Sequence, residues 1–244
     1  MFKIAVVGGY AENYIERCLS SILLQDRGDW ECQVVLDPVG DASFEKARPY
    51  ERPNLKIRIN TDRRYNVKNF LDAFAALNPS DDDILVQIDA DDWLATEQVL
   101  SIVKRYYDAD PAALLTHGSW VSFPKPNVVS NNGAYSAADF TKGVRNVPFR
   151  ASHLRTMKYR IWKNIHDDDL RDDNGKYASI AGDVAIMLPA LEMAGFDRVR
   201  FIKEILYVYN QETLFNDGKQ RAGEQERLAQ WYRSRPPYSR LEEC

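Results

Sequence analysis

The sequence predicts an α/β domain in which helices cover a mostly parallel sheet. Short apolar segments alternate with longer segments whose apolar residues repeat at helical spacing, in the order strand, helix, strand, strand, helix, strand. Such alternation is typical of parallel sheets, because helical crossovers join their strands. The apolar segment at residues 84–88 ends in three carboxylates within four positions, which indicates a binding site at one end of the sheet.

The first half of the chain supplies the predicted parallel strands. They are short apolar runs at residues 2–7, 33–36, 55–59 and 84–88. The intervening segments at residues 12–25, 67–77 and 95–107 are predicted to be helices with one buried face. In the first of these, Ile15, Cys18, Leu19 and Ile22 recur at the spacing of one helix face, which indicates packing on the sheet.

The second half is expected to add strands at residues 112–116, 199–202 and 206–209 and helices at 178–193 and 224–233. Residues 124–149 are rich in Pro, Gly and Asn, so a long loop is expected there, and long loops beside active sites often bind substrate. Residues 150–165 are predicted to form a basic, aromatic helix. Its charged face would meet solvent, an anionic lipid surface or a phosphate-bearing acceptor. The tail at 234–244 contains two adjacent prolines and is expected to be mobile.

Composition indicates one ordinary globular domain spanning residues 1–244. The chain is 45% hydrophobic, and 32 Lys and Arg against 36 Asp and Glu give a net charge of −4, so no basic excess favours a nucleic-acid partner. The three cysteines, Cys18, Cys32 and Cys244, have no metal-ligand spacing and indicate a reducing compartment. No signal peptide or membrane-spanning run is evident. A cytoplasmic location is therefore expected, with any membrane contact peripheral.

Asp89, Asp91 and Asp92 are expected to lie just past the carboxyl end of a buried strand, where open α/β sheets bind their ligands. Carboxylates crowded together repel one another unless a cation lies between them. Asp91 or Asp92 could instead cap the following helix, but one carboxylate would suffice for that role. A metal site is therefore the favoured interpretation. A dinucleotide-binding turn at Gly8 and Gly9 is disfavoured because the Gly-X-Gly-X-X-Gly pattern is missing.

The segment Ile-Asp-Ala-Asp-Asp-Trp-Leu at residues 88–94 resembles the Asp-X-Asp motif of family 2 glycosyltransferases, which have the GT-A fold. Residues 6–10, 35–41 and 60–69 resemble the family's first turn, its Val-Asp-Asp-Gly-Ser-X-Asp segment and its Asn-X-Gly…Ala-Arg-Asn segment. Residues 182–209 resemble its Glu-Asp helix and Leu-Tyr-X-Tyr-Arg strand, with Gly182 in place of the Glu. The Pro and Thr of the first turn, the first Asp of the second segment and its Gly-Ser are absent here.

This resemblance implies a GT-A-like fold with a nucleotide-sugar-binding half at residues 1–118 and an acceptor-side half at 119–244. It also implies a role for individual residues. Asp91 and Asp89 would hold Mn²⁺ or Mg²⁺, and Asp183 would be the catalytic base. The residues implied in donor binding are Gly8, Tyr10, Asp37, Lys68, Asp89 and Ala90, with Lys68 standing where the family usually has Arg. Trp120 and His153 would lie on the acceptor side.

Several of these residues have a structural alternative. Asp37 could be a turn residue before Pro38, Lys68 an exposed helix lysine and Tyr10 part of the core. Asp183 could serve only as a helix cap, since the amino end of a helix favours a carboxylate in either role.

The function implied is a metal-dependent inverting glycosyltransferase. Its donor would be a nucleotide-diphosphate sugar, with UDP- or dTDP-sugars favoured and GDP-sugars possible, and its acceptor a glycan or lipid-linked saccharide. Two alternatives remain. A degenerate member could bind nucleotide-sugars without transferring them, as the altered first turn and Gly182 suggest. A nucleotidyltransferase would also use acidic metal ligands, but the turn at residues 8–12 lacks the basic residue expected there.

Overall fold

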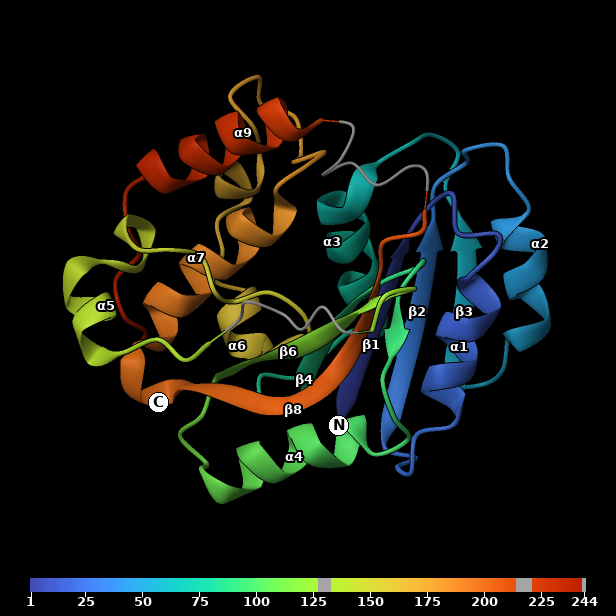
Figure 1. Ribbon diagram of the computed structural model, residues 1–244, viewed down its shortest axis with the longest axis horizontal. Coiled ribbons are helices and arrows are strands. Elements are labelled where there is room, and N and C mark those ends of the chain that lie inside the picture. Colours follow the sequence, from blue (N-terminus) through green and yellow to red (C-terminus); the bar gives the residue numbers. More distant parts are fainter. Residues whose placement is uncertain (127–132, 214–220, 243–244) are drawn as a thin grey trace.

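The computed structural model describes residues 1–126, 133–213 and 221–242. These residues form an eight-stranded sheet in the order β3-β2-β1-β4-β7-β6-β8-β5, with helices on both faces (Figure 1). Strands β3, β2, β1 and β4 are mutually parallel, as are β6 and β8. Strands β7 and β5 are antiparallel to their neighbours. The predicted α/β class with a mostly parallel sheet is therefore confirmed.

The first half follows the predicted order of elements. Its strands are β1 (Phe2–Gly8), β2 (Trp30–Leu36), β3 (Leu55–Ile59), β4 (Ile84–Asp89) and the short β5 (Trp93–Leu94). Its helices are α1 (Ile15–Leu23), α2 (Ser43–Ala47), α3 (Tyr65–Leu77) and α4 (Val99–Ala109). The helix expected from residue 95 begins at Val99, because the backbone N–H of Ala95 still bonds to Leu206 of β8 and a turn follows before the helix. Helix α2 was not predicted, since five residues are too few to show a helical period.

The second half contains β6 (Leu115–Phe123), α5 (Ala137–Lys142), β7 (Arg155–Lys158), α6 (Tyr159–Trp162), α7 (Gly182–Ala194), β8 (Val199–Asn210) and α9 (Ala222–Ser234). The two short strands expected at 199–202 and 206–209 are one continuous strand, β8. The expected loop at 124–149 contains α5, and its residues 127–132 lie outside the described part of the chain. Short 3₁₀ turns occur at Arg48–Tyr50, Val144–Asn146, Asp167–Leu170 and Phe196–Arg198.

The prediction of a basic helix at residues 150–165 is wrong. This segment forms β7 and the single turn α6, and β7 pairs antiparallel with both β4 and β6. Leu154 joins the core on one face of the sheet and Met157 the core on the other, which is strand alternation. The segment lies between β4 and β6, and hydrogen bonding to both strands outweighs the helical spacing of its apolar residues.

The prediction of a mobile tail after residue 233 is also wrong for the described residues, which extend to 242. The backbone N–H of Tyr238 donates to Glu192 on α7, and its hydroxyl donates to Asp169. The backbone N–H of Leu241 donates to the carbonyl of Met193. These hydrogen bonds hold the segment against the carboxyl end of α7 and the turn Asp167–Leu170.

Alternating side chains of the parallel strands enter two separate cores. From β1, Ile4 and Val6 pack with helices α1 and α4, whereas Ala5 and Val7 pack with α3 and α7. Figure 1 shows α3 and α7 on the side of the parallel strands opposite α1. Helix α7 is buried on nearly all sides, so its amino end has a fixed position against α3. Among the described residues, none of the helices has the length and apolarity needed to cross a membrane.

Candidate functional site

A cavity of about 240 Å³ opens where the carboxyl ends of the central strands meet. Strand register places Gly8 beside Leu36, and Val7 beside Asp89, so β1, β2 and β4 end at the same edge. The amino ends of α3 and α7 form the opposite wall. Strand β7 runs antiparallel to β4, so it brings its first residue, Arg155, to this edge as well.

Asp89, Asp92 and His153 converge in this cavity. One ligand atom of each residue lies within 4.8 Å of the others. Asp92 is 1% exposed, and its Oδ1 accepts a hydrogen bond of 2.7 Å from the backbone N–H of Asn210. Its Oδ2 is buried without a well-formed hydrogen bond among the described residues, and the nearby hydroxyl of Tyr207 lowers the pKa of this carboxyl. A buried orphan oxygen in an acidic cluster fits a cation ligand.

Asp89 is held from two directions. Asn66 on α3 donates a hydrogen bond of 2.7 Å to its Oδ1, and the Nη2 of Arg155 lies 3.7 Å from its Oδ2. The backbone N–H of Asp89 also donates to the hydroxyl of Tyr207, at 3.1 Å. Contacts from α3 and β7 therefore orient the carboxylate, and Tyr207 on β8 holds the backbone of the same residue.

Burial controls the charge of the whole cluster. It raises the pKa of Asp92 well above its ordinary value, and the nearby Asp91 and Asp89 raise it further. Burial also raises the pKa of Asp89, an effect that Arg155 opposes and Asp183 reinforces. Burial, with Arg155 nearby, lowers the pKa of His153 well below its ordinary value. The imidazole is therefore neutral, the form that binds metals, and a cation would stabilise both carboxylates in their ionised form.

Asp91 also lines the cavity but is absent from the three-residue cluster. It is half-buried, and its carbonyl accepts a hydrogen bond of 3.2 Å from the side chain of Asn210. Among the three carboxylates of the motif, the structure thus brings Asp89 and Asp92 to His153.

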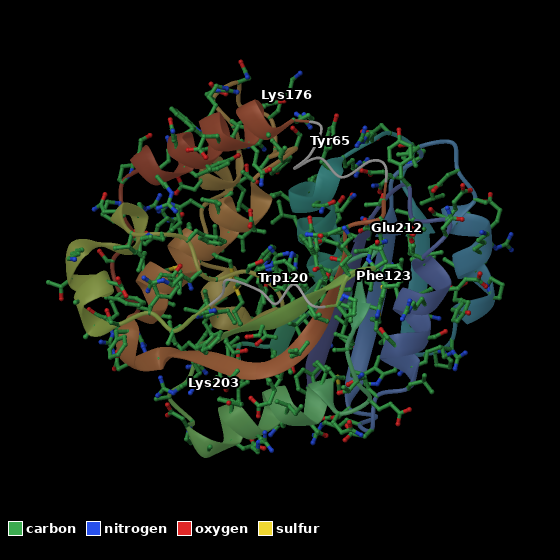
Figure 2. All side chains as sticks on the ribbon, in the orientation of Figure 1. Tyr65, Trp120, Phe123, Lys176, Lys203 and Glu212 are labelled. Atoms are coloured by element: carbon green, nitrogen blue, oxygen red, sulfur yellow. The ribbon has the colours of Figure 1, made fainter. Side chains whose placement is uncertain are left out.

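The other end of the cavity is lined by the first turn, Gly8 to Tyr10. A Cβ added to Gly8 would lie 3.2 Å from the Cβ of Ala90, so the first turn and the acidic motif are in close contact. Tyr10 has a left-handed backbone, with φ of 57°, and its ring lies 5.5 Å from the guanidinium of Arg63. That guanidinium also stacks on Tyr65, at 4.5 Å (Tyr65 is labelled in Figure 2).

Asp37 lines the same end of the cavity and is 5% exposed. Its Oδ1 accepts hydrogen bonds from the side chains of Asn60 and Asn69, at 2.9 and 3.0 Å, and from the backbone N–H of Arg64, at 3.0 Å. Its Oδ2 accepts from the backbone N–H of Tyr65, at 2.9 Å. Asp37 therefore anchors the start of α3, whatever else it binds.

Lys68 does not line this cavity. Its ammonium pairs with Asp72 one turn along α3, and it borders a second cavity of about 890 Å³. Arg63, Tyr65 and Ser179 line both cavities, so Lys68 lies close to the first cavity without lining it.

Asp183 lies in the first turn of α7 and lines the cavity. Its Oδ1 accepts a hydrogen bond of 2.9 Å from the backbone N–H of Val184. The preceding Gly182 packs directly on α3, since a Cβ there would lie 2.6 Å from the Cγ2 of Val67. Close contact between the two helices explains why a glycine occupies the position where the resemblance implies Glu.

The two residues expected on the acceptor side lie in different places. His153 lines the cavity, and its ring stacks on Tyr207 with 4.6 Å between centroids. Trp120 lies on β6 outside the cavity lining, with its ring edge against Tyr209 at 5.1 Å (Figure 2).

The sequence analysis missed several cavity residues, among them Arg155, Gln87 and Asn66. Arg155, 4% exposed, was assigned to a charged helix face that does not form. Gln87, 1% exposed, interrupts the apolar run of β4, and this polar residue was an available signal. Asn66 precedes the apolar face of α3, and only its contact with Asp89 across the cavity identifies it.

Known proteins of similar structure share this fold. TarS of S. aureus, residues 1–349 with UDP-GlcNAc, is 15% identical with a TM-score of 0.61, over 86% of this chain and 59% of that one. The mannosyltransferase PcManGT of Pyrobaculum calidifontis, with GDP-Man and Mn²⁺, is 16% identical with a TM-score of 0.59, over 97% and 66%. Glucosyl-3-phosphoglycerate synthase of Mycobacterium tuberculosis, with Mn²⁺ and UDP, is 15% identical with a TM-score of 0.58, over 98% and 82%. The predicted GT-A-like fold is thereby confirmed.

A comparison with protein-family models assigns the chain to a family in agreement with its fold. No curated protein sequence matched the chain. The family model described as "Glycosyl transferase family 2" matches residues 6–165, which include the first turn, the acidic motif, His153 and Arg155. The chain therefore belongs to glycosyl transferase family 2.

Proposed function

We propose that this chain is a metal-dependent inverting glycosyltransferase that uses a nucleotide-diphosphate sugar. The observation that carries the proposal is the cluster of Asp89, Asp92 and His153 in a cavity at the carboxyl edge of the sheet. Structural neighbours with Mn²⁺ and a nucleotide or nucleotide-sugar bound support it.

A divalent cation held by these three residues would neutralise the diphosphate as it leaves. Carboxylate oxygens suit Mg²⁺ and Mn²⁺ alike. Mg²⁺ binds chiefly oxygen ligands, so the imidazole of His153 favours Mn²⁺. Asn66 and Arg155 would keep the Asp89 carboxylate in position during this step.

Asp183 is the proposed base. It would take the proton of the acceptor hydroxyl while that oxygen attacks the anomeric carbon, and the bond from this carbon to the diphosphate oxygen would break on the opposite side. Its place in the first turn of α7 suits the ionised form a base requires, because the amino end of a helix stabilises negative charge. Its Oδ1 already accepts a hydrogen bond from Val184, so Oδ2 is the oxygen proposed to receive the proton.

The nucleotide is proposed to occupy the end of the cavity between Gly8, Tyr10 and Asp37. The rings of Tyr10 and Tyr65, with the guanidinium of Arg63 between them, offer stacking surfaces for a base. UDP- or dTDP-sugars remain the favoured donors. GDP-sugars remain possible, since the neighbours include one with GDP-Man.

The acceptor is proposed to be a glycan or lipid-linked saccharide that approaches Asp183 from the half formed by residues 119–244. Residues 1–118 would then hold most of the donor. A cytoplasmic location, with possible peripheral contact at a membrane, stays a proposal.

Calorimetry with UDP and GDP, each with Mn²⁺ or with excess chelator, tests the donor and metal together. A transfer and hydrolysis assay with a panel of nucleotide-sugars then tests catalysis. Binding that needs Mn²⁺ and is followed by turnover is expected. Binding without turnover on any donor would favour the degenerate alternative. Full activity in excess chelator would contradict the metal proposal.

A further inference from the structure

The deepest part of the cavity holds two buried polar side chains that lack hydrogen-bond partners. Both polar atoms of the Gln87 amide are unpartnered among the described residues, although this side chain is 1% exposed. The Nε of Arg155, 4% exposed, is likewise unpartnered in the described part of the chain. The Nη2 of this guanidinium lies 3.7 Å from the Oδ2 of Asp89. Leaving such groups buried and unpaired is unfavourable, so a ligand is expected to pair with them.

These two residues lie side by side. Gln87 on β4 and Arg155 on β7 are direct partners in the antiparallel ladder, and both line the cavity. Gln87 precedes Asp89 by two positions, so its side chain projects on the same face of the sheet, about 7 Å further in. Val67, Phe70 and Ile186 supply apolar side walls. The arrangement is a pocket with a polar floor beneath the proposed metal cluster.

The chemistry of this floor matches a pair of neighbouring hydroxyl groups. Arg155 offers N–H donors, the Gln87 amide offers both a donor and an acceptor, and a hydroxyl can accept from one group while donating to another. An anionic substituent is disfavoured, because Asp89 and Asp183 lie at the same end of the cavity. A wholly apolar group would leave the buried amide and guanidinium unpaired.

We infer that Gln87 and Arg155 bind two hydroxyl groups of the donor's sugar ring and so determine which sugar is accepted. The inference rests on the proposed function, since a diphosphate held at the metal cluster carries its sugar next to Asp89. A sugar attached there would lie within reach of Gln87 and Arg155. These residues contact the substrate without taking part in proton transfer.

The experiment compares UDP with UDP-glucose, UDP-galactose and UDP-N-acetylglucosamine, and GDP with GDP-mannose, by calorimetry in the presence of Mn²⁺ and without acceptor. In Gln87→Met, affinity for the sugar-nucleotide that binds the unchanged protein should fall about tenfold, whereas affinity for the nucleotide diphosphate alone should not change. Arg155→Lys keeps the positive charge beside Asp89 but loses the guanidinium fork, so affinity for the sugar-nucleotide should fall further than affinity for the nucleotide diphosphate.

Deoxy analogues of the bound sugar-nucleotide identify the hydroxyl groups. Removing the hydroxyl that Gln87 binds should weaken binding by the unchanged protein about tenfold, and that penalty should disappear in Gln87→Met. Equal penalties in the two proteins at every ring position would overturn the inference.

Gln33→Met is the matched control. Gln33 is a buried glutamine on β2 whose amide donates to the carbonyls of Val34 and Lys56, away from the cavity. Its replacement should lower the melting temperature and leave sugar-nucleotide affinity unchanged. Gln87→Met should keep or raise the melting temperature, because it removes an unpartnered buried amide.

The outcomes distinguish failure of the sugar-binding inference from failure of the proposed function. If the unchanged protein binds a sugar-nucleotide, and Gln87→Met and Arg155→Lys bind it equally well, only the sugar-pocket inference fails. If the unchanged protein binds none of these compounds with Mn²⁺, and does not bind dTDP either, the proposed function fails and the inference fails with it.

Discussion

The contact between Gly182 and Val67 predicts a cost for adding a single methyl group at the amino end of α7. In Gly182→Ala the new Cβ would lie 2.6 Å from the Cγ2 of Val67, about 1 Å closer than an ordinary carbon–carbon contact. Overpacking of this kind costs about 1–3 kcal/mol. The better helix propensity of alanine returns at most about 1 kcal/mol.

The net loss in the free energy of unfolding is therefore expected to be about 0–2 kcal/mol, with a middle value of about 1 kcal/mol. For a domain of this size that middle value corresponds to a fall in melting temperature of about 2–4 °C. Gly223→Ala is the matched control, because Gly223 lies in the first turn of α9 and its added Cβ has no neighbour within 4 Å. This control variant is expected to be as stable as the unchanged protein or slightly more stable.

A double-mutant cycle tests the cause. Val67 is fully buried, with 0% exposure. Val67→Ala alone therefore leaves a cavity and should destabilise the fold by about 1–3 kcal/mol. In the double variant the methyl of Ala at position 182 would occupy part of that cavity, so the two losses should fall short of additivity by about 1 kcal/mol. Urea unfolding followed by circular dichroism measures all four proteins. Losses that add to within about 0.5 kcal/mol would refute the close contact.

Three further predictions concern the cavity. Asp92→Asn and Asp89→Asn should weaken Mn²⁺-dependent nucleotide binding more than Asp91→Asn does, as measured by calorimetry; the opposite ranking would return the main metal role to Asp91. Asp183→Asn should bind donor normally and lose transfer by about two orders of magnitude or more, whereas near-normal transfer with earlier melting would make Asp183 a cap. Asp37→Ala should lower stability, because four N–H groups lose their acceptor, and should weaken UDP binding about ten- to a hundredfold. Unchanged affinity in a folded variant would limit Asp37 to anchoring α3.

The sequence alone determined the parallel half of the sheet and the acidic edge of the site. Each apolar run of β1 to β4 is short and is followed by a turn or helix, and this information is local to the segment. The order of these elements then requires their carboxyl ends to lie together. The place of Asp89 at the carboxyl end of β4, where that strand pairs with β1, therefore follows from the apolar run and the carboxylates that end it.

Only the tertiary structure decided which carboxylates meet which partners. Asp92 is oriented by Asn210 of β8, and Asp89 by Arg155 of β7, two strands that are distant in sequence from the motif. The segment containing Arg155 has apolar residues at helical spacing, yet it forms a strand because its backbone groups pair with both β4 and β6. Hydrogen bonds between strands depend on neighbours in the sheet and are invisible in a local pattern. For this reason His153 and Arg155 line the cavity although the sequence of their segment predicts a helix.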